Sequence, residues 1–378
     1  MSVTGAHAAP KSVPIKALKE FSQSSSVEAI VANNKALFTY ENLFGQSADI
    51  KVRAVDFAGN EIWSKTIDSG LDEVATAMAI DSQGTIWLAG NSATAALPES
   101  QTVTSSVLNP DAIEVESIKP LRGDMNNISV WQISASGEVI SQISTPTSAL
   151  IDAISVSSSG LSILGSRENE NFLISLSLGK FSKELKIGTT KTKLNAITRS
   201  NDGTTYLFGS SSETLSGKKL VGRIDGILIK IAKNGTIASV VRSSAPKAIR
   251  DWQSVTSSLF VTGSVKSGNT LESALTKFNS SFVPTWTLRL PSTGRTLAAN
   301  GMNGSVYAIL EPTSAIKGVT GFKLAKGQSV ALQFDSKGLL TAGFSSPELT
   351  TVVSVSYSNI AGLFLLTNTG KILQIPLG

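Results

Sequence analysis

A pattern of strand, tight turn and strand recurs along this 378-residue chain, and it constrains the fold more than any other feature. In its clearest copy, small residues precede a turn at Asp81 to Gly84, and a second strand begins at Thr85. Related units begin near Val27, Glu73, Leu150, Leu194, Arg250, Arg295 and Thr351. The spacing is roughly 44 to 56 residues apart from one longer interval, which is typical of an array of four-stranded units.

The residue types within each unit indicate how the strands are arranged. First strands are small, as at Ala75, Ala77 and Ala153, and suit the narrow space where sheets converge on an axis. Second strands are larger, as at Trp87 and Tyr206, and end in glycine, which predicts a break after each. We therefore expect an all-β fold, a single seven-bladed β-propeller of four-stranded blades.

The two ends of the chain suggest how this ring closes. The last unit contains only three strand patterns, and residues 13–18, with the sequence VPIKAL, alternate as a fourth strand would. We expect this N-terminal strand to pair into the last blade and cover its exposed edge. Residues 1–12 would then be a flexible tail, and residues 13–378 would be the propeller, with an insertion loop at 93–127.

Composition excludes several classes of site. The chain has no cysteine, and its single histidine, His7, lies in the tail, so the body has neither a thiolate site nor a Ser-His-Asp triad. The turns lack the alternating acids of a calcium loop, so no metal and no cofactor are expected. A net charge of +5 is too small to indicate nucleic acid, and no apolar run is long enough for a membrane span.

Three segments together resemble a known kind of repeat: Asp81 to Ser92 (DSQGTIWLAGNS), Asp225 to Thr236 (DGILIKIAKNGT) and Phe57 to Thr66 (FAGNEIWSKT). They are similar to the serine-rich β-blade propeller repeats of bacterial secreted and cell-surface proteins. This resemblance implies a propeller in an envelope or extracellular setting and carries no catalytic residues. Ala6-His7-Ala8 also fits the small-x-small rule of a signal-peptide cleavage region, although the charged start and apolar core are missing.

Two places could bind a partner, and the first is the set of long connections between second and third strands. These connections should emerge on one face, where propeller partners dock. The 93–127 loop is acidic, whereas two other connections are basic and carry the candidate binding residues Lys218, Lys219, Arg223, Lys317, Lys323 and Lys326. The simpler alternative is that these loops are only solvated insertions.

The second place is the axial channel, where counting back from the hairpin glycines predicts an inward polar ring. Its candidate lining residues are Thr76, Asp152, Asn195, Asp251, Thr296 and Ser354. A hydrated structural funnel is the simpler alternative, but Asp152 and Asp251 could also act as an acid pair.

Two functions follow from these sites. The first is a non-catalytic extracytoplasmic binding or scaffolding module, monomeric, with a protein or glycan partner on its loop-rich face. The second is a carbohydrate-active enzyme with a carboxylate pair at the channel mouth.

Overall fold

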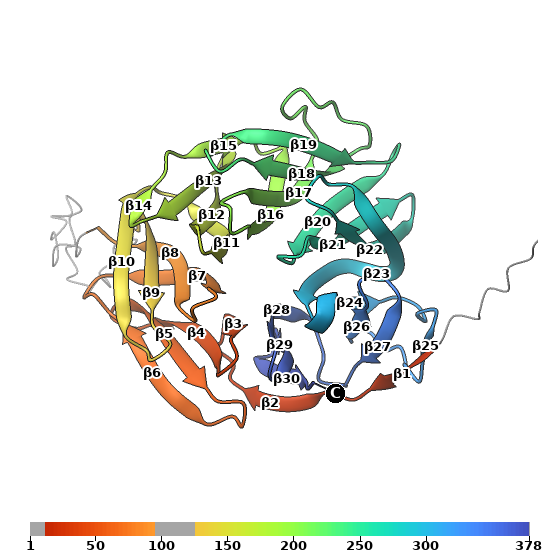
Figure 1. Cartoon of the computed structure of the whole chain (residues 1–378), viewed down its shortest axis with the longest axis horizontal. Coiled ribbons are helices and arrows are strands. Elements are labelled where there is room, and N and C mark those ends of the chain that lie inside the picture. Colours follow the sequence, from red (N-terminus) through yellow and green to blue (C-terminus); the bar gives the residue numbers. More distant parts are fainter. Residues whose placement is uncertain (1–11, 95–124, 378) are drawn as a thin grey trace, which may run out of the picture.

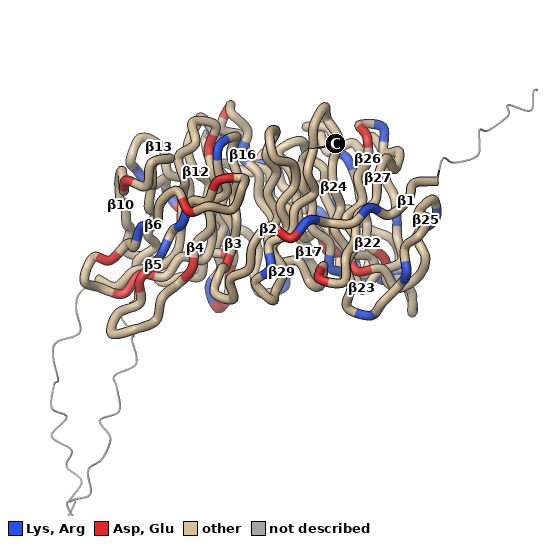
Figure 2. Tube along the Cα trace, turned by 90° about the horizontal axis from the view of Figure 1, so that it is seen from below, with Lys and Arg blue, Asp and Glu red and all other residues tan. Residues whose placement is uncertain are grey.

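A computed structural model describes residues 12–94 and 125–377 of the protein. Within these residues the chain is all-β apart from one short 3-10 turn, η1 (Met302–Gly304). The sheets stand around a central axis (Figure 1), so the structure is the all-β propeller that the repeat predicts. Seen from the side (Figure 2), the strands run between the two faces of the ring, and the turns and loops lie on these faces.

Five sheets are discrete blades of four or five strands. The first consists of β3 (Ala29–Ala32), β4 (Leu37–Phe44), β5 (Ala48–Val55) and β6 (Glu61–Ile67); the second of β7 (Glu73–Ile80), β8 (Ile86–Ser92), β9 (Asn127–Ile133) and β10 (Val139–Pro146). The third consists of β11 (Leu150–Ser157), β12 (Gly160–Arg167), β13 (Glu170–Ser177), β14 (Lys180–Phe181) and β15 (Leu185–Ile187); the fourth of β16 (Thr192–Arg199), β17 (Thr205–Ser211), β18 (Asp225–Ile231) and β19 (Ile237–Ser243). The last discrete sheet consists of β28 (Val352–Ser358), β29 (Gly362–Thr367), β30 (Lys371–Ile375) and β2 (Lys19–Gln23).

The prediction of seven four-stranded blades is wrong, because the remaining strands form one continuous nine-stranded sheet. It contains β20 (Ile249–Val255), β21 (Phe260–Ser267), β22 (Thr270–Phe278), β23 (Pro284–Asn300), β24 (Val306–Pro312), β26 (Val330–Phe334), β27 (Leu340–Phe344), β1 (Val13–Lys16) and β25 (Val319–Thr320). The physical reason is β23, a 17-residue strand without a break. Its first half pairs with β22 and its second half with β24, with a register shift between Ser292 and Thr296. The expected boundary at Arg295 therefore lies inside one strand.

The N-terminal strand that joins the last sheet lies later in the chain than predicted. Residues 13–18 do not enter it, because β1 runs parallel to β25 and β27 in the nine-stranded sheet. Instead β2 pairs antiparallel with β30. Phe21 of β2 packs edge-on against Phe364, with ring centroids 5.1 Å apart. The first described strands thus connect two sheets formed by the C-terminal part of the chain.

The apolar core lies between neighbouring sheets rather than at the centre of the ring. Between the first and second sheets, for example, Val52 and Ile50 pack with Ile86 and Trp131, and all four are fully buried. The strands with small residues, such as β7, β11 and β16, lie nearest the axis (Figure 1). Narrow side chains thus stand where the sheets converge, and large ones fill the wider gaps between sheets.

The glycines that were expected to end the second strands instead lie within them. Gly90, Gly165, Gly209 and Gly263 are strand residues, each paired with the residue just before a one-residue bulge in the innermost strand. A β-carbon on Gly209 would lie 1.9 Å from the carbonyl oxygen of Lys193, and one on Gly90 would lie 1.9 Å from that of Val74. These glycines are needed because the bulged backbone leaves no room for a side chain.

Candidate functional site

The bulges of the innermost strands place polar side chains between neighbouring sheets. The extra residue is Thr76 in β7, Asp152 in β11 and Asn195 in β16. The Thr76 hydroxyl donates a hydrogen bond to the Ile151 carbonyl, at 3.0 Å. The Asn195 amide donates to the Asp251 carboxylate and to the Trp252 carbonyl, both at 2.8 Å. Thr76 and Asn195 therefore connect one innermost strand to the next, whereas Asp152 is exposed.

Thr296 and Ser354, the other predicted channel residues, also make contacts within the ring. Thr296 is 1% exposed, its hydroxyl lies 2.5 Å from that of Ser273, and its N–H donates to the Gln253 side chain at 3.0 Å. The Ser354 hydroxyl accepts a hydrogen bond from the Ile30 N–H at 3.2 Å. Counting from the hairpin glycine misses the bulge in both units. The extra residue of β28 is Val353, and the register shift of β23 lies between Ser292 and Thr296.

The two acids proposed as a pair lie on different sheets. Asp152 is on β11 and Asp251 is on β20, and β16 lies between these strands (Figure 1). Asp251 instead accepts the Asn195 hydrogen bond. Burial raises the pKa of Asp152, while the Ser166 hydroxyl and Lys193 act in the opposite direction. The structure therefore does not bring the two carboxylates into contact.

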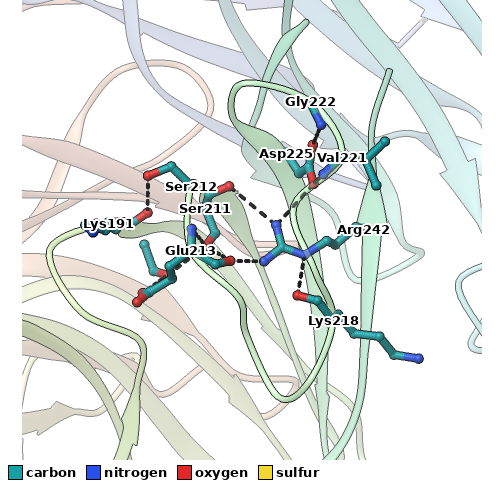
Figure 3. Close-up of polar contacts among 10 residues, drawn as sticks. Lys191, Ser211, Ser212, Glu213, Lys218, Val221, Gly222, Asp225 and Arg242 are labelled. Carbon is teal, nitrogen blue, oxygen red and sulfur yellow. Dashed lines mark hydrogen bonds and ion pairs between the residues drawn. The ribbon is translucent and has the colours of Figure 1, made fainter. Parts of the chain in front are cut away.

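A buried ion pair anchors the first basic loop, residues 212–224 between β17 and β18. Asp225, fully buried, lies 3.2 Å from the guanidinium of Arg242, whose side chain is 6% exposed (Figure 3). The carboxylate also accepts hydrogen bonds from the N–H groups of Val221 and Gly222, at 2.9 and 2.8 Å. Burial acts to raise the pKa of Asp225, but the hydrogen bonds from the Val221 and Gly222 N–H groups, with smaller contributions from Ser244 and Arg242, lower it below its usual range.

Arg242 and Glu213 hold the rest of this loop. The Arg242 guanidinium donates to the backbone carbonyls of Lys218, at 3.1 Å, and of Glu213 (Figure 3). The Glu213 carboxylate accepts hydrogen bonds from the hydroxyl of Thr192, at 2.6 Å, and from the backbone and hydroxyl of Thr189. Glu213, the acid of this loop, therefore accepts its hydrogen bonds from within the protein.

The cations of the same loop are exposed to solvent. Lys218, Lys219 and Arg223 are all exposed, and among the residues the structure describes they form no ion pair. The fold thus fixes the backbone of loop 212–224 with its acids and leaves its three cations available.

The second basic loop, residues 313–329 between β24 and β26, follows the same scheme. Glu311, at its base, accepts a hydrogen bond from the Gly327 N–H at 2.9 Å, and Ile316 is buried. The candidate residues Lys317, Lys323 and Lys326 are exposed. In the ring this loop lies with β25, away from β17 and β18 (Figure 1), so the two basic loops are separate patches.

Charge on the body of the ring is mixed. In the side view, Lys and Arg alternate with Asp and Glu over the strands (Figure 2), so the basic loops are local features rather than parts of a uniformly basic surface. Most of the predicted acidic loop, residues 95–124, lies outside the described residues.

Across residues 12–94 and 125–377, no three His, Cys, Asp or Glu side chains are grouped so that they could hold a metal ion. In the same part of the chain, no helix has the length and apolar character needed to cross a membrane.

Sequence reasoning missed the residues that organise loop 212–224. Asp225 is the first residue of β18 and Arg242 lies in β19, and neither was among the candidate site residues. The available signal was an aspartate at the start of the buried third strand, together with an arginine in the strand that pairs with it. Neither residue type reveals from sequence that both are buried.

Comparisons with known proteins identify the fold and nothing finer. No family model matches the chain, and no curated protein matches its sequence. Among solved structures, one described as a streptogramin B lyase has a TM-score of 0.54 at 11% identity, covering 96% of this chain and 97% of the other. The Dos1 propeller (TM-score 0.51, 11% identity, 96% and 83% covered) and the WD40 domain of Toxoplasma gondii coronin (0.52, 11%, 97% and 87%) are also similar. At such identity these likenesses show a β-propeller fold alone.

Proposed function

We propose that this protein is a non-catalytic binding module whose two basic loops bind an acidic polysaccharide. The observation that carries the proposal is the division of roles at each loop, between an acid in the loop or at its base and the exposed cations. The acids, Glu213 and Glu311, accept hydrogen bonds that fix the loop, while the cations remain exposed. Fixed loops lose less conformational entropy when they bind, which favours binding over a purely solvated surface.

The separation of the two patches favours a polymer over a small ligand. A small anion could contact only one of the loops, because they lie in different sectors of the ring (Figure 1). A long chain with repeated carboxylates can contact both, and the second contact then forms at a high effective concentration. Each exposed charge contributes only about 1 kcal/mol or less, so several contacts are needed for useful affinity.

Binding to immobilised polygalacturonate tests this proposal, with neutral dextran as the control polymer. We expect binding that weakens as salt is added, because salt screens exposed charges. Reversing one loop (Lys218→Glu, Lys219→Glu, Arg223→Glu) or the other (Lys317→Glu, Lys323→Glu, Lys326→Glu) should weaken binding about ten-fold or more.

A matched control separates local from overall charge. Lys35→Glu, Lys65→Glu and Lys337→Glu change three exposed lysines elsewhere and alter the net charge by the same amount as each loop variant. This control should bind like the wild type. If it weakens binding as much as the loop variants do, or if the wild type does not bind, the proposal is wrong. Unchanged polygalacturonate chain length after incubation is expected, whereas shortening would contradict a non-catalytic role.

We also propose that the protein acts outside the cytoplasm and as a monomer. The setting is supported by the likeness of Asp81 to Ser92 to envelope propeller repeats and by the signal-like Ala6-His7-Ala8, which lies outside the described residues. Fractionation of the producing cells, with detection by antibody, tests the location; recovery only with cytoplasmic proteins would refute it.

Light scattering tests the oligomeric state, and a mass near the chain's 39.5 kDa is expected.

A further inference from the structure

A cavity lies between the third and fourth sheets, at the opposite ends of the strands from loop 212–224. It has a volume of about 420 Å³ and is lined by the turns that follow β13, β16 and β18. The pairing of β16 with β17 places Arg199 and Thr205 at this end and Thr192 and Ser211 at the end next to the loop. The cavity is therefore distinct from both basic loops, and its size is that of a small-molecule site.

Arg199 lines this cavity and has no carboxylate partner among the residues that the structure describes. Its guanidinium donates to the Ser159 hydroxyl at 2.9 Å, to the Ser162 hydroxyl at 2.8 Å and to the Ser159 carbonyl at 3.2 Å. All of these acceptors are neutral, and Arg199 forms no ion pair within the described part of the chain. Burial acts on the same group, lowering the pKa of Arg199 while the charge of Asp202 acts in the opposite direction. A partly buried cation with only neutral acceptors favours an anion as its counter-charge.

The other charges around the cavity are also mainly positive. Lys180, Lys183 and Lys233 line it, and Asp202 is the one acid among its described lining residues. Its carboxylate accepts hydrogen bonds from the Thr204 N–H at 2.9 Å and from the Thr204 hydroxyl at 3.0 Å. Lysines from two different sheets therefore line the same space as Arg199, and a bound anion would lie next to both sheets.

The rest of the cavity wall is apolar, and a sugar ring could pack against it. Leu173, Phe181, Leu185 and Ile231 line the cavity together with the hydroxyl groups. A bare inorganic ion would leave this wall in contact with water, whereas a sugar ring could pack on Phe181 and bond to the serines. We propose that this cavity binds a small organic phosphate or sulfate monoester, with Arg199 forming hydrogen bonds to the anionic group.

Titration calorimetry at low salt tests the site with three probes: glucose 6-phosphate, glucose 6-sulfate and neutral glucose. At least one ester should bind with a Kd below about 1 mM, and glucose should not bind in that range. Whichever ester binds more tightly identifies the source of the anion. If neither ester binds better than glucose, the proposal is overturned and Arg199 only braces the surrounding serines.

Variants locate the binding. Arg199→Met should weaken ester binding at least ten-fold, whereas Arg53→Met should not. Arg53 is a half-buried arginine of the first sheet that pairs with Glu61 of the same sheet. Because Arg199→Met removes contacts to Ser159 and Ser162 and could unfold the protein, a second variant changes only the exposed rim: Lys180→Ala, Lys183→Ala and Lys233→Ala. It should fold normally and bind several-fold more weakly.

The outcomes separate this site from the polysaccharide site. The loop variant Lys218→Glu, Lys219→Glu, Arg223→Glu should bind the ester like the wild type. Ester binding that is lost in the loop variant, or that persists unchanged in a folded Arg199→Met protein or in the rim variant, places the anion elsewhere and refutes the assignment.

Discussion

Asp225→Asn removes the negative charge beneath loop 212–224 while nearly preserving side-chain volume. In the wild type the fully buried carboxylate accepts hydrogen bonds from Val221 and Gly222 and pairs with Arg242 at 3.2 Å. In the variant, Arg242 keeps its charge without a counter-ion, and an amide group must face two N–H donors. Breaking one side of a buried ion pair costs about 3–5 kcal/mol, and we expect the free energy of unfolding to fall by about that amount.

Guanidinium unfolding, followed by the fluorescence of the five tryptophans, measures this cost, and limited proteolysis reports on the loop. The double variant Asp225→Asn, Arg242→Met should be less destabilised than the sum of the two single variants, with a coupling of about 1–3 kcal/mol. A loss below about 1 kcal/mol for Asp225→Asn, with no new cleavage between residues 212 and 224, would refute the view that this pair anchors the loop.

The difference in unfolding free energy between the wild type and Asp225→Asn should depend on pH. Because the pKa of Asp225 is lowered in the folded protein, its contribution to stability is complete above the unfolded pKa of about 3.9 and is lost as the pH falls through the folded pKa. The stability difference between wild type and Asp225→Asn should therefore be largest near pH 7 and shrink below about pH 4. A difference that stays constant down to pH 2.5 would show that the carboxylate is not the stabilised form.

Other predictions concern the ring itself. Gly209→Ala should lower the free energy of unfolding by about 2–3 kcal/mol or more, because its β-carbon would meet the Lys193 carbonyl at 1.9 Å, whereas Gly45→Ala, with its nearest contact at 3.8 Å, should be nearly neutral in the same denaturation assay. Asn195→Ala should cost about 1–3 kcal/mol, since it leaves Asp251 and the Trp252 carbonyl without this donor. Asn195→Asp should be worse at pH 7 and recover toward the alanine value in acid; equal stability of the two at pH 7 would contradict close contact with Asp251.

The propeller could be predicted because its signals are local. Small residues in β7, larger residues in β8 and hairpin turns such as Asp81 to Gly84 each depend on a few neighbouring residues. The division into blades could not be predicted in the same way. Whether β23 breaks into two strands or continues depends on its partners β22 and β24, which the sequence of β23 alone does not reveal.

The candidate sites show the same limit. Exposed lysines in long connections could be found from sequence, because length and charge are visible there. The roles of Asp225, Arg242 and Arg199 depend on burial and on partners far along the chain, such as Ser159 for Arg199. The polar residues at the bulges could be found by spacing. Their partners could not, because Thr76 and Asn195 donate hydrogen bonds to carbonyl groups of the adjacent innermost strand.

Both proposed sites depend on the order of the sheets in the ring, and the pairing of β2 with β30 is the contact that closes it. Gln23 lies opposite Lys371, and the neighbouring Ser24 N–H bonds the Gly370 carbonyl, so Gln23 and Lys371 form a non-hydrogen-bonded pair with close side chains. The chain has no cysteine, so Gln23→Cys, Lys371→Cys can form only one intramolecular disulfide. Mild oxidation followed by intact-mass analysis should show near-complete loss of two hydrogens in the monomer, with Gln23→Cys, Lys266→Cys remaining reduced. Free thiols or only intermolecular dimers in the first variant would contradict the closed ring.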